Sequence, residues 1–216
     1  MRYRVKGLEI RSENAAKPMA QASRPLTRWL MEMEPVHSAL DFGCGKLRYS
    51  RYIAKRSKEI TLVDSQIQLD RIQRIGGRLT TVRTYAERNW PGCRVFTAEA
   101  FGSDTQRYDF ILCANVLSAI PDRSMQSNAL LRMGAALRQK GCCLFVTQFR
   151  NSYFKALLNS PKAMSHLDGW IIRTGRGNFY YGMLDKSRLI GLVVANGLSV
   201  KDAWVDGQSA YVLAGK

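Results

Sequence analysis

The stretch between residues 37 and 64 constrains the fold more than any other part of the chain. An apolar run at 38–42 leads directly into the glycine turn G-C-G at 43–45, and apolar residues at helical spacing follow it. A second run, rich in β-branched residues, then occupies 59–64. Periodicity and turn residues of this kind predict a strand, a glycine turn, a helix and a second strand, which together form a βαβ unit.

The same stretch carries the residues of a nucleoside-binding site. Gly43 and Gly45 would let a ligand approach bare backbone where the helix begins, and Asp64, 21 residues after Gly43, ends the second strand. A dinucleotide fingerprint has a third glycine where this chain has Arg48, which argues against NAD or FAD. The alternative is a βαβ unit whose glycines only make a tight turn.

The segment Asp41-Phe-Gly43-Cys-Gly45-Lys-Leu47 resembles motif I of the class I S-adenosylmethionine (SAM) methyltransferases, D/E-x-G-x-G-x-G, with Leu47 in place of the last glycine. The resemblance implies SAM as the cofactor, with the two glycines beside its ribose and amino-acid part and Asp64 accepting both ribose hydroxyls. It also implies an acid after the third strand that accepts a hydrogen bond from adenine. The cofactor-binding residues that we expect are Asp41, Gly43, Cys44, Gly45, Asp64, Ser65, Glu99, Ala100, Asn115 and Val116.

The remainder of the chain resembles the fold of this family. Further strands are expected at 93–97, 108–114 and 142–148, and helices at 66–75, 78–89, 124–139 and 185–196. Two last strands at 198–205 and 209–214 flank the turn Asp206-Gly207. We therefore expect an α/β, Rossmann-like class I methyltransferase fold. Its sheet would be seven-stranded and mostly parallel, with helices on both faces and an antiparallel C-terminal hairpin.

Residues 1–36 are expected to form an N-terminal helical lead, or lid, beside the cofactor. Its first twelve residues are basic and irregular, and two short helical pieces broken at Pro18 and Pro25 follow. Residues 37–216 form a single methyltransferase domain in this interpretation, because the chain has no internal repeat and no low-complexity linker. The alternation of strand and helix stops at 149–184, which we expect to be an insertion on the substrate side.

Methyl transfer from a sulfonium is an in-line displacement, so the protein mainly has to hold the acceptor against the methyl carbon. Asn115, with Val116 beside it, follows the fourth strand at the edge where open α/β sheets hold their ligands. Asn115 is therefore the candidate catalytic residue, and its alternative role is to cap a helix. Lys17 or Arg28 would reach the methionine carboxylate, and the alternative for either is a surface cation. For Glu99 the alternative is an exposed loop acid.

Composition narrows the class of protein. The chain has 46% hydrophobic and 23% charged residues, no run of 18 apolar residues and no secretory segment, so we expect a folded cytoplasmic protein without a membrane segment. Five cysteines without a CxxC pair indicate reduced thiols. Two histidines far apart in the sequence do not suggest a metal site.

Positive charge is the feature that indicates a partner. Lys and Arg number 33 against 17 Asp and Glu, and the only acid between residues 123 and 184 is Asp168, while residues 46–58 hold six cations and no acid. Nucleic acid is the expected partner, because neutralised phosphates release counterions and aromatic rings can stack a base. The alternative for the cations is a solvated basic surface, and the alternative for the aromatic residues is core packing or a cap over the cofactor. The contact residues that we expect are Arg150, Tyr153, Lys155, Arg173, Arg176, Tyr180 and Tyr181.

The expected function is SAM-dependent methylation of DNA or RNA. The chain lacks the D/N/S-P-P-Y/F/W motif of DNA amino-methyltransferases and any Pro-Cys nucleophile, so the acceptor atom stays open. The segments NVLSAIP, SENAAKP and FYYG are similar to methyltransferase-like proteins of bacterial DNA modification and defence systems, which implies a protein partner in a modification complex. The two alternatives are a small-molecule methyltransferase and a non-catalytic SAM-binding subunit of such a complex.

Overall fold

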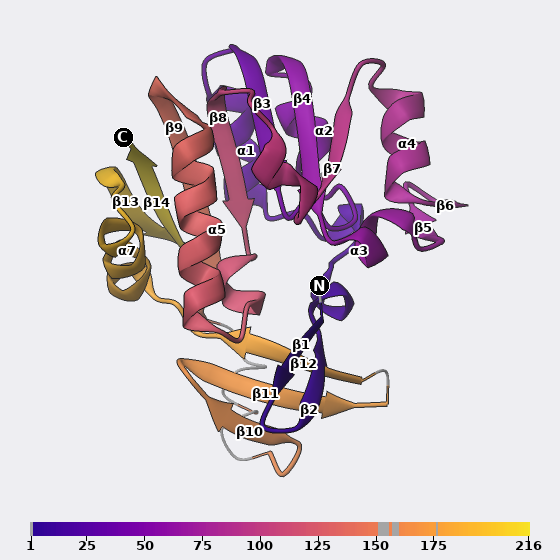
Figure 1. Cartoon of the computed structure of the whole chain (residues 1–216), viewed down its shortest axis with the longest axis vertical. Helices are drawn as coiled ribbons and strands as arrows, with labels where there is room; N and C mark the ends of the chain where they lie inside the picture. The colour runs from indigo at the N-terminus through magenta and orange to yellow at the C-terminus, as the bar shows by residue number, and fades with distance from the viewer. Residues whose placement is uncertain (1, 151–155, 157–159, 176) are drawn as a thin grey trace.

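The computed structural model describes residues 2–150, 156, 160–175 and 177–216. Its main sheet has seven strands in the order β13-β14-β9-β8-β3-β4-β7 (Figure 1). The five strands from β9 to β7 are parallel, and β14 and β13 join as an antiparallel pair. The bounds are β3 (Val36–Phe42), β4 (Ser57–Asp64), β7 (Arg94–Thr97), β8 (Tyr108–Ala114), β9 (Leu137–Gln148), β13 (Ser199–Asp206) and β14 (Ser209–Gly215). The predicted sheet and C-terminal hairpin are confirmed.

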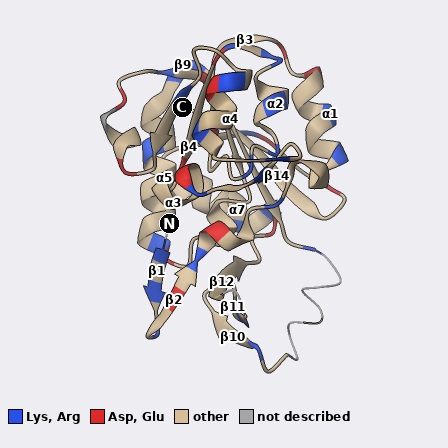
Figure 2. Ribbon diagram, turned by 90° about the vertical axis from the view of Figure 1, so that its right-hand side faces the viewer, with Lys and Arg blue, Asp and Glu red and all other residues tan. Residues whose placement is uncertain are grey.

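A second sheet, called here the small sheet, has five strands in the order β1-β2-β12-β11-β10. It lies at the end of the molecule toward which β3, β4 and β8 point (Figures 1 and 2). Its strands are β1 (Arg2–Val5), β2 (Leu8–Arg11), β10 (Ala163–His166), β11 (Gly169–Thr174) and β12 (Gly177–Gly182). The parallel pairing of Asn178 with Ile10 joins the N-terminal hairpin β1–β2 to the strands of residues 163–182 in this sheet. The prediction of an irregular start was therefore wrong.

Helices cover both faces of the main sheet. The α-helices are α1 (Arg24–Glu32), α2 (Ser50–Ile53), α3 (Gln66–Asp70), α4 (Val82–Asn89), α5 (Arg123–Ala136) and α7 (Lys186–Ala195), and the 3-10 helices are η1 (Ser12–Ala15), η2 (Met19–Gln21), η3 (Ala100–Ser103) and η4 (Leu117–Ala119). Asp122 and Asp185 cap α5 and α7 by accepting backbone N–H bonds. No helix among the described residues is long and apolar enough to cross a membrane.

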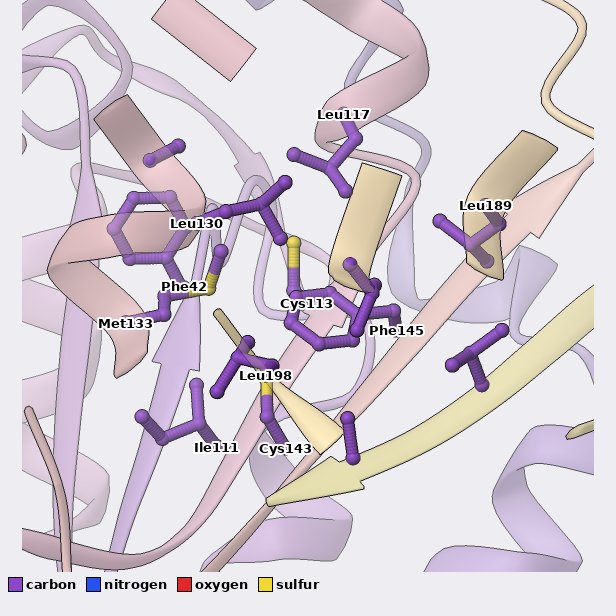
Figure 3. Close-up of a cluster of buried hydrophobic side chains, with 14 of the residues drawn as sticks. Phe42, Ile111, Cys113, Leu117, Leu130, Met133, Cys143, Phe145, Leu189 and Leu198 are labelled. Atoms are coloured by element: carbon purple, nitrogen blue, oxygen red, sulfur yellow. The ribbon is translucent and has the colours of Figure 1, made fainter. Parts of the chain in front are cut away.

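Alternation along the central strands divides the core into two layers. Ile111 and Cys113 of β8 pack with Leu130 and Met133 of α5 on one face of the sheet (Figure 3). Phe110 and Leu112 point to the opposite face, toward α1, α2 and α4. A strand that is buried on both faces reads as a continuous apolar run, which is why β8 was predictable. All five cysteines are free thiols, as expected.

Several expected helices are shorter than the sequence pattern indicated. The helix predicted at 66–75 ends at Asp70, and the predicted 78–89 helix begins only at Val82. Between them β5 (Gln73–Ile75) and β6 (Arg78–Thr80) form a hairpin, because Gly76 and Gly77 both adopt positive φ. A pair of glycines interrupting a helical pattern is therefore a hairpin turn in this chain.

Two further boundaries differ from the prediction for steric reasons. Pro25 lies in the first turn of α1, where its missing N–H costs no helical bond, so it starts the helix that it was expected to break. Helix α5, expected to run to residue 139, ends at Ala136, and Gly141 lies inside β9. A Cβ at Gly141 would approach the Tyr108 carbonyl oxygen to 2.8 Å, so this position needs glycine for close strand packing.

Candidate active site

The glycine turn connects β3 to α2 with a backbone that favours glycine. Gly43 and Gly45 have φ values of +76° and +59°, and the N–H groups of Gly43 and Cys44 both donate to the Val63 carbonyl oxygen, at 2.7 and 3.0 Å. A Cβ at Gly43 would lie 2.2 Å from Val116 Cγ2. The turn after β3 and the loop after β8 are therefore in direct contact.

Asp64 closes the turn from the neighbouring strand. Its Oδ2 accepts the Gly45 N–H at 2.8 Å, and its Oδ1 accepts the Ser65 N–H at 2.7 Å. Burial raises the pKa of this carboxyl, and the two backbone N–H bonds oppose that effect without cancelling it. The carboxylate is held rigidly at the carboxyl end of β4.

Asp41 lies beneath the turn and is only 3% exposed. Its Oδ2 accepts a hydrogen bond from Ser50 Oγ at 2.6 Å, which ties the start of α2 to β3. Burial raises its pKa to about 7, although the bond from Ser50 acts in the opposite direction. The protonation state of this buried group therefore changes near neutral pH.

A polar network behind the turn was not expected from the sequence. Gln68 is 1% exposed, and its Nε2 donates to the Gly45 carbonyl oxygen at 2.6 Å and to Gln73 Oε1 at 3.2 Å. Arg71 Nη2 donates to Gln68 Oε1 at 2.5 Å and to the Glu13 carbonyl oxygen at 2.8 Å. These bonds connect the turn to η1 of the N-terminal segment. Nothing in the local spacing indicated that Gln68 would be buried.

The predicted cofactor-binding residues meet in one cavity at the carboxyl edge of the sheet. The cavity lining includes Asp41, Gly43, Cys44, Gly45, Asp64, Ser65, Asn115 and Val116. It also includes Tyr3, Lys17, Lys46, Arg48, Tyr49, Ala98, Met125, Asn128, Ala129 and Arg132. Glu99 and Ala100 are exposed and do not line it, and of the two candidate cations Lys17 lines it while Arg28 does not.

Arg132 of α5 organises the loop after β7. Its Nη1 donates to the Ala98 carbonyl oxygen at 2.6 Å, and its Nη2 donates to the Glu99 carbonyl oxygen at 3.0 Å. A Cβ on Gly102 would lie 2.3 Å from Nη2, so glycine there leaves room for the guanidinium. Arg132 lies in the acid-poor stretch 123–184 that suggested a basic surface, but the structure places it in the cavity wall.

Asn115 joins the ends of β8 and β9. It has φ of +61°, a conformation that asparagine tolerates better than most residues. Its N–H donates to the Val146 carbonyl oxygen at 2.7 Å, and its Oδ1 accepts the Gln148 N–H at 2.9 Å. The short helix η4 receives no side-chain cap, so the capping alternative is wrong. A carboxamide whose oxygen is engaged offers its NH₂ as a donor, and it cannot act as a base.

Four of the seven residues expected to contact nucleic acid lie in the described part of the chain, and one of these four is buried. Tyr180 is 1% exposed and packs with Ile10 and Ile171 inside the small sheet, so it cannot stack a base. Tyr181 is half-buried and donates its hydroxyl to the Gln148 carbonyl oxygen at 3.4 Å. Arg173 is exposed on β11, and Arg150 lies over the Phe149 ring. Tyr153, Lys155 and Arg176 lie outside the described residues.

A mostly parallel sheet with a glycine turn after one central strand and a carboxylate after the next defines a nucleoside-binding α/β protein. Comparison with known proteins narrows this class. The model of the methyltransferase domain family matches residues 13–190. The chain is also 38% identical over 215 residues to YmfD of Escherichia coli K12, described as an uncharacterized protein, covering 100% of this chain and 96% of that one.

Solved structures agree in fold. A SAM-dependent methyltransferase from Methanosarcina mazei has a TM-score of 0.66 at 15% identity, covering 90% of this chain and 98% of that chain. The 1,6-didemethyltoxoflavin-N1-methyltransferase of Burkholderia thailandensis, solved with 1,6-didemethyltoxoflavin and S-adenosylhomocysteine, has a TM-score of 0.62 at 17% identity, covering 89% of this chain and 77% of that chain.

The chain belongs to the methyltransferase domain family. The predictions of a class I, SAM-dependent methyltransferase and of its Rossmann-like sheet are confirmed by the family match together with these folds.

Proposed function

We propose that this chain transfers a methyl group from SAM to a nucleic acid. We infer a nucleic-acid acceptor from the net charge of +16, because nucleic-acid affinity depends first on neutralising phosphates. The observation that carries the cofactor is the cavity in which Asp64 and the bare backbone of Gly43 and Gly45 meet. A methyl group on a sulfonium is already activated, so positioning supplies most of the catalysis.

The cavity residues fit SAM in chemical type. Asp64 has acceptor oxygens for the ribose hydroxyls, and Lys17 has a cation for the methionine carboxylate. Ala98, Met125 and Ala129 give the cavity apolar wall for a flat adenine ring. With Arg132 holding the Ala98 and Glu99 carbonyls, we assign the adenine edge to the backbone of this loop rather than to the Glu99 side chain.

Tyr3 and Asn115 are the polar side chains that we assign to the acceptor. Burial raises the pKa of the Tyr3 phenol, and Asp64, Glu99 and Asp122 raise it further. The phenol therefore stays protonated and acts as a hydrogen-bond donor. The Asn115 oxygen accepts the Gln148 N–H, so the carboxamide would meet the acceptor through its NH₂ group, which is a donor. Neither group removes a proton from the acceptor at neutral pH, so their contribution is to hold it in line with the methyl group.

A small-molecule acceptor is the second candidate, and the small sheet favours it. Tyr3 of β1 lines the cavity, and Gly182 of β12 packs near the Ser118 carbonyl oxygen of η4. The small sheet thus covers part of the carboxyl edge of the main sheet, which would suit a compact substrate enclosed between the two sheets. One protein of similar fold is named as a methyltransferase of 1,6-didemethyltoxoflavin, which is a small molecule.

Incubation of the purified protein with methyl-labelled SAM and separated pools of DNA, RNA, protein and metabolites distinguishes the two candidates. We expect label in DNA or RNA, and none with the Asp64→Ala variant as the matched control. Label in the metabolite pool alone would refute the nucleic-acid proposal and support the second candidate. No label in any pool, with S-adenosylhomocysteine bound in calorimetry, would support a cofactor-binding subunit that needs a partner.

A further inference from the structure

The two helices beside the glycine turn, with the turn that follows the second helix, carry four exposed cations. Arg24 and Arg28 are four residues apart on α1 and so share a helix face, while Arg51 lies on α2 and Lys55 lies in the turn directly after it. The helices pack against each other, and blue cation-bearing segments mark both in Figure 2. These four residues are called here the α1–α2 basic face.

The opposite sides of the same helices are apolar and buried. Leu26 and Leu30 of α1 and Ile53 of α2 are fully buried in one cluster of the core. This packing fixes both helices and points their cations outward. It also leaves α1 no free apolar stripe with which to enter a lipid surface, as a membrane-binding amphipathic helix would need. The face is therefore suited to a hydrophilic polyanion.

The charges of the α1–α2 basic face are not neutralised by acids. No ion pair among the described residues involves any of its four members, whereas Arg83, Arg94, Arg123 and Arg138 are each paired with an aspartate. Residues 14–58 hold nine cations and three acids. One of those acids, Asp41, is buried. Glu32 is the last residue of α1, four residues after Arg28, and Glu34 follows the helix.

The basic face adjoins the cavity. The Ser23 N–H, directly before α1, donates to Tyr49 Oη at 3.3 Å, and Tyr49 lines the cavity next to Arg48. Lys17 and Lys46 line the cavity from the same part of the chain. Positive charge thus extends from the cavity wall onto the surface of α1 and α2.

We propose that the α1–α2 basic face binds the phosphate backbone of the nucleic-acid acceptor. This inference rests on the proposed function, and it moves the interface away from residues 150–181, where the sequence pattern suggested it. Each contacted phosphate releases condensed counterions and adds about 0.7–0.9 to the slope of log affinity against log salt. Four contacts therefore account for a slope of about 3.

The test compares two variants that lose the same charge. The face variant carries Arg24→Gln, Arg28→Gln, Arg51→Gln and Lys55→Gln. The matched control carries Arg78→Gln, Arg88→Gln, Lys140→Gln and Lys186→Gln, four exposed cations on β6, α4, β9 and α7 that take part in no ion pair among the described residues. Both variants lower the net charge from +16 by four. Calorimetry with S-adenosylhomocysteine checks that both retain the cofactor site.

The probes are a fluorescent mixed-sequence DNA duplex, its single strand and the same sequence as RNA, titrated at several salt concentrations. We expect the face variant to bind the preferred probe at least about tenfold more weakly at low salt and to lose about 2–3 from the slope. The control should keep the wild-type slope to within about one contact. Methyl incorporation at subsaturating nucleic acid should fall with the face variant only.

Equal weakening in both variants, or none in either, would overturn the assignment of this face while leaving the proposed function intact. The assignment would also be overturned if the face variant lost binding to anionic lipid vesicles or to an acidic protein while its nucleic-acid affinity stayed unchanged. If the wild-type protein itself binds and methylates none of the three probes, the proposed function fails, and that result is distinct from the first two.

Discussion

Gly43→Ala is expected to damage both the fold and the cofactor site, because its new methyl group has no room. The Cβ would lie 2.2 Å from Val116 Cγ2 and 3.2 Å from Cγ1. Carbon atoms in contact are normally about 3.5–4.0 Å apart, so the closer pair would overlap by about 1.5 Å. The turn after β3 and the loop after β8 would have to separate, and the cavity lies between them.

The expected cost has three parts. An alanine at φ of +76° is strained by about 1–2 kcal/mol. Overpacking against Val116 adds about 1–3 kcal/mol, and the lower entropy of the unfolded alanine chain offsets about 0.4–1 kcal/mol. The free energy of unfolding should therefore fall by about 2–4 kcal/mol, which lowers the Tm of a chain of this length by about 5–15 °C.

Two further variants separate strain from overlap. Gly92→Ala places a methyl group at φ of +81° with no atom within 4 Å, so urea unfolding of this variant measures backbone strain and the unfolded-chain entropy without steric overlap. Val116→Ala removes both colliding methyl groups, so the double variant Gly43→Ala, Val116→Ala should recover about 1–3 kcal/mol relative to additivity. Calorimetry with S-adenosylhomocysteine should show about tenfold weaker binding for Gly43→Ala and partial recovery in the double variant.

A cost of Gly43→Ala no larger than that of Gly92→Ala, or simple additivity in the double variant, would contradict a steric requirement for glycine at position 43. Either result would mean that the two loops separate easily. The close approach would then not be what requires glycine at this position.

The remaining predictions concern the carboxylates and Arg132. Asp64→Ala should abolish S-adenosylhomocysteine binding in calorimetry, and unchanged affinity would contradict its assignment to the ribose. Asp41 holds a proton in the folded state up to about pH 7 that the unfolded chain releases near pH 4, so stability should fall by on the order of 4 kcal/mol as pH rises through this window. Asp41→Asn should flatten that slope in urea unfolding; a parallel slope would exclude Asp41 as its source. Arg132→Ala should raise KM for SAM about tenfold with kcat little changed, because the Ala98 and Glu99 carbonyls lose their hydrogen-bond donors. A fall in kcat alone would instead indicate that Arg132 positions the substrate that receives the methyl group.

Neighbouring residues made the glycine turn predictable. Positive φ at Gly43 and Gly45 and the strand end at Asp64 depend on residue type and on spacing within one βαβ unit. The seven-stranded sheet was predictable for a related reason. Its parallel strands are buried on both faces and therefore read as apolar runs, and the C-terminal hairpin has a strong turn signal.

Burial of polar residues was not predictable in the same way. Gln68 donates to the Gly45 carbonyl oxygen, and Arg132 donates to the loop after β7. Their residue types are equally common on a solvent-exposed surface, so residue type alone did not indicate these contacts. Tyr180 belongs to a stretch of aromatic residues, yet the side of β12 on which it lies places it in the interior. A shift of one residue in register would reverse that side, and register depends on the partner strand.

The family, the glycine turn and the carboxylate at position 64 were predictable because each depends on residues close together in the chain. The sequence pattern did not indicate that residues 2–11 join the small sheet beside β12, that Tyr3 reaches the cavity, or that the cation-bearing helices α1 and α2 pack against each other. These features arise from contacts between segments far apart in the chain. Local propensity carries no information about which distant strand or helix will be the partner.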